Sequence, residues 1–209
     1  MSTLTADIVI GPEMAGVSMS PEEFDSATEW NEFYTYELIN GVLVVAPAPG
    51  VAERGPNELL SRWLGNYQEH HPQGSALDYT VTQQDVRVGE NRRRADRVIW
   101  AGLGRLPDFD NDVPAIAIEF VSAGLRNWQR DYQLKRKEYH AAGISEYWVI
   151  DRFRRQMTVY RRVGSRSVKL TIDDDEVYTT SLLPGFELPV AKLFDEADRV
   201  ASPQRKRRR

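Results

Sequence analysis

The sequence of 209 residues predicts an α/β domain, in which a mixed β-sheet is flanked by α-helices. Two observations predict this fold class. Short apolar strands alternate with amphipathic helices along the chain. The segment 114–151 has the pattern strand, helix, strand, with the apolar runs PAIAIEFV and ISEYWVID at its two ends. Such a unit joins two parallel strands by a right-handed crossover, so its helix lies on one face of the sheet.

The N-terminal half begins with a short helix in SPEEFDSATEW (20–30). Ser20 is its predicted N-cap, and Glu23 stands three residues later, as in a capping box. The segment 33–50 is a predicted β-hairpin, because Asn40-Gly41 separates two apolar runs and is a strong turn signal. A helix follows at 53–71, where leucines and aromatic residues recur with helical spacing. The pair His70 and His71 is expected to cap its end.

The remaining elements follow in order. Strands are predicted at 75–88, 95–103 and 114–122, a helix at 125–143 with Gly143 as its C-cap, and further strands at 144–151, 155–162, 167–172 and 176–180, with 182–194 ending the domain. We therefore expect one domain at 19–197. It is preceded by a flexible lead-in at 1–18 and followed by a basic disordered tail at 198–209.

Composition excludes several classes of protein. The chain has no cysteine, which excludes a disulfide scaffold, a zinc–thiolate site and a cysteine nucleophile, and suits a reducing cytoplasm. No apolar run approaches the roughly 18 residues of a membrane helix. The start MSTLTADIVIGPEM has no early basic cluster, so it is not expected to be a signal peptide. We expect a cytoplasmic protein with no membrane partner.

Charge limits how the chain binds nucleic acid. The net charge is −4, and since the last five residues RKRRR contribute +5, the rest of the chain carries −9. Such a body does not attract polyanions in general. Binding of DNA would depend on local arginine clusters and on a metal ion.

Two carboxylates carry most of the functional information. Asp96 in RRADRVIW and Glu119 in PAIAIEFVS each lie in a predicted buried strand, where an acid is costly unless it has a partner. Two such strands can hold both carboxylates on one Mg²⁺ or Mn²⁺, with water and substrate phosphate completing the coordination. Lys135 follows on the next helix, and Glu37 is a third acid among apolar residues. This set suggests metal-dependent hydrolysis of a phosphodiester, with Lys135 assisting.

Each of these residues also has a structural explanation. Arg94 and Arg97 are available to neutralise Asp96. Asp131 and Lys135 stand four residues apart and can form an ordinary helix ion pair. Glu37 can equally contact the metal or support the site from nearby. Glu119 is the hardest to explain structurally, because AIAIEFV offers it no local partner.

The motifs, taken together and in order, carry a family resemblance. YELINGVLVVAPAP, RRADRVIW and IAIEFVSAGLRNWQRDYQLKRKEYHAAGISEYWVID resemble the Uma-two family of endonucleases, in the restriction-endonuclease-like PD-(D/E)xK superfamily. The similarity extends roughly over residues 20–190. It implies a restriction-endonuclease-like mixed sheet flanked by helices, a Mg²⁺-dependent nuclease site and DNA as substrate. By position, Asp96 and Glu119 would be the metal ligands.

The resemblance assigns two further roles and shows three departures. Lys135 would stand in for the superfamily lysine, and Glu37 would be the N-terminal acid. The superfamily motif has proline before the aspartate and lysine two residues after the glutamate, whereas this chain has Ala95 and Val121. Asn57 stands where relatives often carry histidine.

The main functional prediction is a Mg²⁺-dependent DNA endonuclease, with a homodimer suited to cutting both strands. The first alternative is a catalytically inactive nucleic-acid-binding or regulatory module on the same fold, motivated by the departures and the acidic body. A weaker alternative is a hydrolase of other phosphodiesters. No G-x-S-x-G motif supports a serine hydrolase.

Overall fold

In the computed structural model, which describes residues 8–201, the chain forms two units. The first comprises residues 8–48 and 85–94, and the second comprises 49–84 and 95–201. Two of the three boundaries fall inside long strands, β5 (Leu77–Val88) and β6 (Asn91–Ala101), and the third lies between Ala48 and Pro49.

The first unit is built around a hairpin. Its elements are β1 (Ile8–Ile10), a 3₁₀ turn (Pro12–Met14), α1 (Pro21–Asp25), β2 (Ala27–Trp30), β3 (Tyr34–Ile39) and β4 (Val42–Pro47). Strands β3 and β4 pair antiparallel through a two-residue turn, in which Asn40 and Gly41 have φ of 51° and 73°. Positive φ at both positions is what a type I′ hairpin turn requires. The predicted hairpin is therefore confirmed.

The first unit also has its own small core. The buried apolar residues come from four of its elements and from Met19 between them; they are Ile10, Met19, Phe24, Tyr36, Leu38 and Leu43. Helix α1 is held at its start by the predicted capping box, since the Ser20 side chain accepts from Glu23 N while the Glu23 carboxylate accepts from Ser20 N. Strands β1 and β2 were not predicted, because three or four residues are too few to show a period. Strand β1 lies in the predicted lead-in, whose residues 1–7 lie outside the described residues, and β2 lies in the segment 20–30 that was predicted as a helix.

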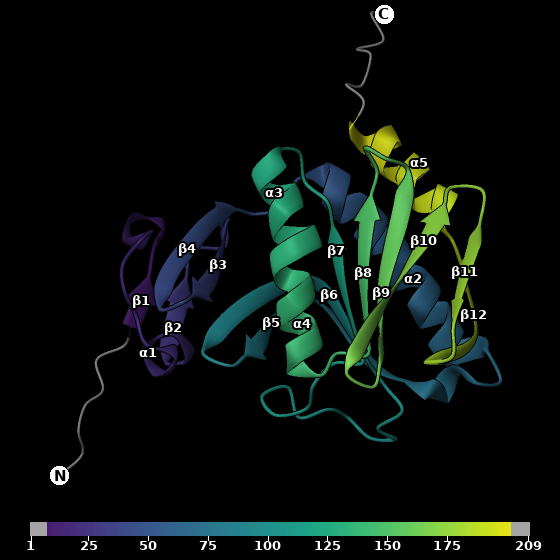
Figure 1. Ribbon diagram of the computed structural model, residues 1–209, viewed down its shortest axis with the longest axis horizontal. Helices are drawn as coiled ribbons and strands as arrows, with labels where there is room; N and C mark the ends of the chain where they lie inside the picture. Colours follow the sequence, from purple (N-terminus) through teal and green to yellow (C-terminus); the bar gives the residue numbers. More distant parts are fainter. Residues whose placement is uncertain (1–7, 202–209) are drawn as a thin grey trace, which may run out of the picture. The chain divides into compact units, whose positions relative to one another are not determined.

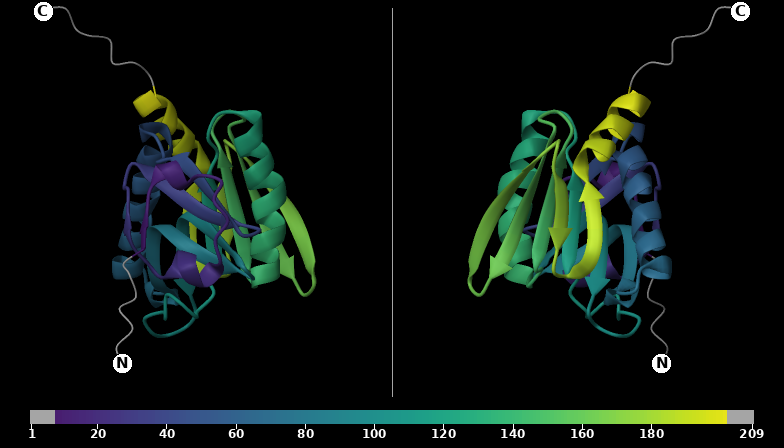
Figure 2. Two further views of the ribbon diagram at one scale, coloured as in Figure 1. Left: turned by 90° about the vertical axis from the view of Figure 1, so that its left-hand side faces the viewer. Right: turned by 90° about the vertical axis from the view of Figure 1, so that its right-hand side faces the viewer.

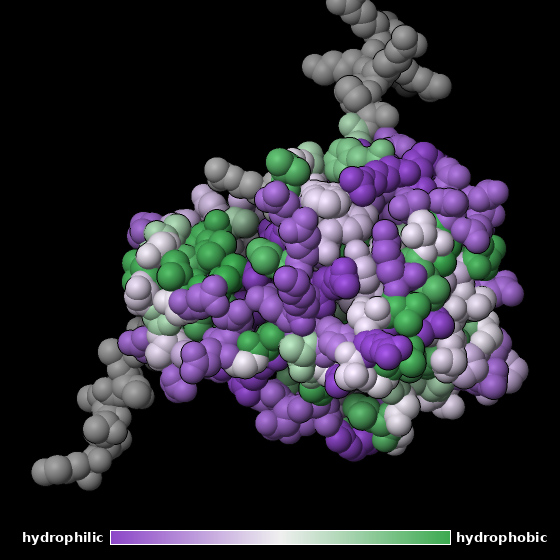
Figure 3. All heavy atoms as spheres, viewed as in Figure 1, coloured by the Kyte–Doolittle hydropathy of each residue, from purple (hydrophilic) through white to green (hydrophobic). Residues whose placement is uncertain are grey.

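One apolar surface lies on the hairpin. Apolar side chains gather over β4 in the space-filling view (Figure 3), where Val42 and Val44 are exposed. The start of β4 is partly covered, since Leu43 N donates to Val17 O. Exposed apolar edge strands are places where another chain can pair. The homodimer predicted from function stays a prediction.

The second unit contains the large mixed sheet. Its strands run in the order β10 (Arg166–Asp173), β9 (Gln156–Val163), β8 (Glu146–Asp151), β7 (Ile116–Phe120) and β6, and β5 pairs with β6. Strands β7 and β8 are parallel, and β6–β7, β8–β9 and β9–β10 are antiparallel. The parallel pair confirms the predicted crossover at 114–151. Strands β11 (Val177–Thr180) and β12 (Leu183–Pro189) form a separate antiparallel pair.

Helices cover both faces of this sheet (Figures 1 and 2). One face carries α2 (Val51–His70) and α5 (Val190–Ala201). The other carries one continuous helical segment made of α3 (Leu125–Gln129), a π-helix (Arg130–Lys135) and α4 (Arg136–Ala142). This helix ends as predicted at Gly143, whose φ is 98°. The predicted α/β fold with a mixed sheet between helices is confirmed.

The main core lies between the sheet and the α2–α5 pair. Strand β7 contributes the alternate residues Ile116, Ile118 and Phe120 to this core. They pack with Leu60 and Leu64 of α2. Because side chains alternate across a strand, Ala117 and Glu119 project to the opposite face, under the π-helix and α4. The core therefore sets the direction in which Glu119 points.

Two elements of the second unit differ from the sequence-based expectation. Helix α5 was not predicted, although its buried residues Val190, Leu193, Phe194 and Ala197 recur with helical spacing. The π-helix within the predicted helix 125–143 was not predicted either. No helix described in residues 8–201 is long and apolar enough to cross a membrane. The tail predicted as disordered from residue 198 begins within α5, which extends to Ala201, and residues 202–209 lie outside the described residues.

Candidate active site

Two neighbouring strands bring Asp96 and Glu119 to one face of the sheet. Strands β6 and β7 pair with Arg97 opposite Ile118 and Val98 opposite Ala117. One step further in this register, Asp96 stands opposite Glu119, and opposed residues of an antiparallel pair share a face. The Phe120 backbone N–H donates to Asp96 Oδ2 at 2.8 Å, which ties the two strands together at this point. The structure thus brings together the two acids that the sequence singled out.

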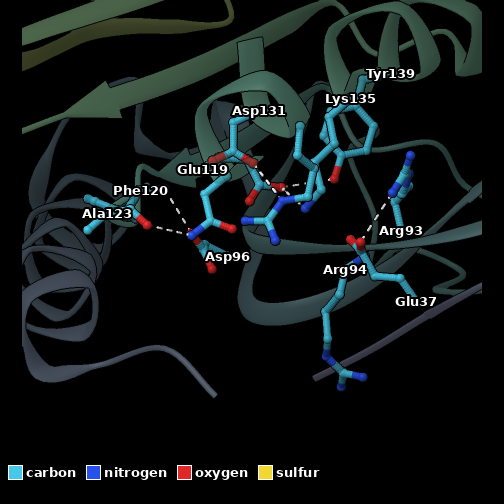
Figure 4. A network of polar contacts seen from close by, with 12 residues as sticks. Glu37, Arg93, Arg94, Asp96, Glu119, Phe120, Ala123, Asp131, Lys135 and Tyr139 are labelled. Atoms are coloured by element: carbon cyan, nitrogen blue, oxygen red, sulfur yellow. Dashed lines mark hydrogen bonds and ion pairs between the residues drawn. The ribbon is translucent and has the colours of Figure 1, made fainter. Parts of the chain in front are cut away.

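Glu119 is deeply buried and paired with the helix above it. Its side chain is 3% exposed and that of Lys135 is 2% exposed. Lys135 Nζ donates to Glu119 Oε1 at 2.8 Å, and the Tyr139 hydroxyl donates to the same oxygen at 3.0 Å (Figure 4). Burial raises the pKa of Glu119 well above its usual range, and Lys135 opposes that rise. A buried carboxylate of this kind gains from any further positive charge placed beside it.

Asp96 is half-buried and held by two donors. Gln83 Nε2 donates to its Oδ1 at 3.1 Å, and Phe120 N donates to its Oδ2. Burial raises the pKa of the Asp96 carboxyl, while the hydrogen bond from Phe120 and the charge of Lys135 lower it. Each carboxylate oxygen therefore receives one of these bonds and has a second acceptor position.

The π-helix places a third acid and the lysine beside these carboxylates. Asp131 is fully buried, and its Oδ1 accepts from Arg130 Nε at 3.0 Å. Its charge also raises the pKa of Glu119. π-Helical turns inside α-helices are often found at functional sites. Asp96, Glu119 and Asp131 with Arg130 and Lys135 carry a formal charge of −1 when all are ionised.

This donor set fits a hard divalent cation. Carboxylate oxygens are the ligands that Mg²⁺ and Mn²⁺ prefer, and Mg²⁺ keeps several waters rather than an all-protein cage. Among residues 8–201 no group of three or more His, Cys, Asp or Glu side chains forms a metal site by itself. A site of two carboxylates, completed by water and substrate phosphate, is consistent with the ligand preference of Mg²⁺ and with the lack of a three-residue cluster among residues 8–201.

Glu37 belongs to the first unit and has its own partners there. Arg93 Nη1 lies 3.2 Å from Glu37 Oε2, and Arg94 N donates to Glu37 Oε1 at 3.0 Å (Figure 4). Glu37 and Arg93 are both buried. This buried pair gives Glu37 a structural role within its own unit. The catalytic role predicted for it stays a prediction.

The arginines that flank Asp96 in sequence pair with other groups. Arg97 Nε donates to Asn57 Oδ1 at 2.7 Å and Arg97 Nη1 donates to Thr80 Oγ1 at 3.0 Å. Arg94 Nη1 lies 3.3 Å from Asp85 Oδ1. Asn57 Nδ2 also donates to the backbone oxygen of Asp96 at 3.0 Å, so this residue of α2 supports β6 from the core side.

Three contacts at the site were not predicted. Tyr139 lies four residues after Lys135 on the same helix, and its bond to Glu119 was not predicted. Gln83 and Asn57 reach Asp96 from elements 13 and 39 residues away in sequence. The one available signal was the polar run Thr82–Asp85 within an otherwise regular strand.

A separate groove lies elsewhere in the second unit. It has a volume of about 620 Å³ and lies between the end of α2 and β12, where Trp63, Tyr67, His71 and Phe186 line it. None of the candidate site residues lines this groove. This groove is therefore separate from the carboxylate site.

Comparisons with known proteins agree with this fold. A family model described as "Uma2: Putative restriction endonuclease" matches residues 21–191. Among solved structures the chain is similar to "a putative nuclease belonging to DUF820" from Anabaena variabilis, with a TM-score of 0.64 and 16% identity, over 86% of this chain and 99% of that one. At this identity the similarity shows the fold. Comparison with curated proteins found no match.

Proposed function

Because the chain belongs to the Uma2 family of restriction-endonuclease-like nucleases, we propose that it is a Mg²⁺-dependent endonuclease that hydrolyses phosphodiester bonds of DNA. The observation that carries the proposal is the pairing of Asp96 and Glu119 across β6 and β7, with Lys135 Nζ 2.8 Å from Glu119. Mn²⁺ is expected to replace Mg²⁺, since both prefer oxygen ligands.

Asp96 and Glu119 would hold the cation, which would supply activation of a water and offset negative charge on the scissile phosphate. Lys135 favours the ionised form of Glu119 and so opposes the effect of burial, because an ammonium beside a carboxylate stabilises its charge. An ammonium has three donors, so Lys135 can also hold the attacking water or a phosphate oxygen. The Tyr139 hydroxyl donates a second hydrogen bond to Glu119 Oε1, beside the one from Lys135.

The experiment is cleavage of supercoiled plasmid with Mg²⁺ and with Mn²⁺. We expect cleavage by wild type, loss of cleavage in Asp96→Asn and Glu119→Gln, and full cleavage by the control Asp175→Asn, which changes an exposed aspartate in the second unit. The two site variants keep the size of the side chain and remove its charge. Cleavage by Asp96→Asn at the wild-type rate would overturn the assignment. Labelled RNA and a small phosphodiester, assayed beside DNA, test the substrate class.

The second candidate is a catalytically inactive nucleic-acid-binding or regulatory module. It is favoured by Ala95 and Val121, which replace the superfamily proline and lysine, and by the closed contact of Glu119 with Lys135 and Tyr139. This reading predicts no binding of Mg²⁺ or Mn²⁺ in calorimetry. Metal binding that is lost in Asp96→Asn would exclude it. Cytoplasmic location and a homodimer remain predictions under either candidate.

A further inference from the structure

Gln83 adopts a backbone conformation that is unusual inside a strand. Its φ is 53°, although it lies within β5 and is not a glycine. For a residue with a Cβ the left-handed region is strained. Such strain persists where surrounding contacts hold it, and it is common at functional sites. The conformation therefore calls for an explanation.

The side chain of Gln83 provides that explanation. Its Nε2 donates to Asp96 Oδ1 at 3.1 Å. A carboxylate only accepts hydrogen bonds, so the amide nitrogen must be the atom that faces it. A local irregularity of the backbone re-aims a side chain that regular alternation would send elsewhere. The strained backbone thus directs the amide at one of the two candidate metal ligands.

Two donors from different strands then fix the Asp96 carboxylate. Phe120 N, on β7, donates to Oδ2 (Figure 4), and Gln83, on β5, donates to Oδ1. One bond alone would leave the carboxylate free to rotate about that bond. With one donor on each oxygen, the plane of the group is determined. A ligand oriented in this way binds a cation without first losing rotational freedom.

We propose that Gln83 is a positioning residue, which orients Asp96 for divalent-cation binding and is held in a strained conformation for that purpose. This inference rests on the proposed function in its metal-binding part. It adds a residue outside the Asp96, Glu119 and Lys135 set, on a strand that none of those residues occupies.

Two variants separate the effect of the Gln83 amide donor from the effect of its strained backbone. Gln83→Met keeps the length of the side chain and the left-handed backbone but has no donor. Gln83→Gly removes both the donor and the strain. Gln68→Met is the matched control, because Gln68 Nε2 also loses a hydrogen bond, in its case to Leu77 O of β5 at 2.7 Å.

Mn²⁺ affinity is measured by calorimetry, and the χ1 rotamer of Asp96 by three-bond NMR couplings in EDTA. We expect Gln83→Met and Gln83→Gly to bind Mn²⁺ about 10–100-fold more weakly than wild type, as for other residues that orient a metal ligand. Gln68→Met should bind as wild type does. Without metal, Asp96 should keep one rotamer in wild type and average between rotamers in both Gln83 variants. Gln83→Gly should unfold at higher denaturant than Gln83→Met, since it lacks the strain.

The outcomes separate the two proposals. Equal Mn²⁺ affinity in wild type and both Gln83 variants overturns the role of Gln83 and leaves the proposed function standing. If wild type binds no metal, the proposed function fails. The Asp96 couplings measured without metal then show whether Gln83 orients the Asp96 carboxylate. An Asp96 rotamer that stays fixed in Gln83→Met shows that the amide does not position it, whatever the metal does.

Discussion

Lys135→Met tests the electrostatics of the site. The substitution keeps an unbranched side chain in a buried position and removes its charge. Glu119 then has no ammonium at 2.8 Å, and its bond from Tyr139 remains. The formal charge of the site changes from −1 to −2, because Lys135 is lost and the three acids and Arg130 remain.

The expected loss of stability follows from the burial of both partners. Lys135 and Glu119 have side chains 2% and 3% exposed, so the charge left behind has no water to solvate it. Breaking a buried pair in this way costs about 3–5 kcal/mol. The lower end applies, since Tyr139 still donates to Glu119 and the carboxylate can take up a proton. We expect a loss of about 3 kcal/mol in the free energy of unfolding, roughly a hundredfold in the equilibrium constant.

The assay is denaturant unfolding followed by tryptophan fluorescence, with EDTA and with saturating Mn²⁺. A cation bound by Asp96 and Glu119 supplies the positive charge that the variant lacks and stabilises only the folded state. The loss should therefore be smaller with Mn²⁺ than with EDTA. Lys137→Met is the control, because Lys137 is exposed on the same helix and should change stability by less than about 0.5 kcal/mol. Equal losses with EDTA and Mn²⁺ would refute the reasoning.

Three further predictions concern residues outside the site. Glu146 is buried and accepts from Trp148, Arg161, Tyr178 and Thr180, so Glu146→Ala should cost about 3–5 kcal/mol in unfolding experiments. Mn²⁺ affinity, measured on the folded variant, should not change. The hydrogen bond from Arg92 lowers the pKa of Asp25, so the stability this pair contributes is present above the usual pKa of 3.8 and is lost as pH falls toward the lowered value. Asp25→Asn should remove that part of the acid dependence in pH-dependent unfolding, and an unchanged profile would contradict it. Gly185→Ala should lower the melting temperature, because φ at Gly185 is +78° and a Cβ there would meet the His71 ring.

Local signals in the sequence predicted the elements that frame the site. Asn40-Gly41 predicted the hairpin and Gly143 the helix end, and both have the expected positive φ. The run PAIAIEFV was predicted to be a buried strand without a local partner for Glu119. That absence was informative, because the partner proved to be Lys135 on the following helix. Asp151 ends β8, and its Oδ1 accepts from Phe153 N and Arg154 N.

The contacts that the sequence did not reveal are long-range ones. Gln83 reaches Asp96 through a left-handed backbone that no local pattern encodes. Asn57 supports β6 from a helix 39 residues earlier, so its role depends on how α2 packs on the sheet. The π-helix is a change of one hydrogen-bond register, and apolar periodicity over so few residues does not resolve it. Local chemistry thus predicted the acids and Lys135, and tertiary structure identified Gln83, Asn57 and Tyr139 as further residues that hold them.

The measurement that tests the central claim most directly is anomalous diffraction from crystals of the protein soaked in Mn²⁺. The account predicts one strong peak within bonding distance of a carboxylate oxygen of Asp96 and one of Glu119, with no peak there in Asp96→Asn. A peak elsewhere with none at these two residues, or no peak at all at a Mn²⁺ concentration that saturates binding in calorimetry, would contradict the assignment of this site.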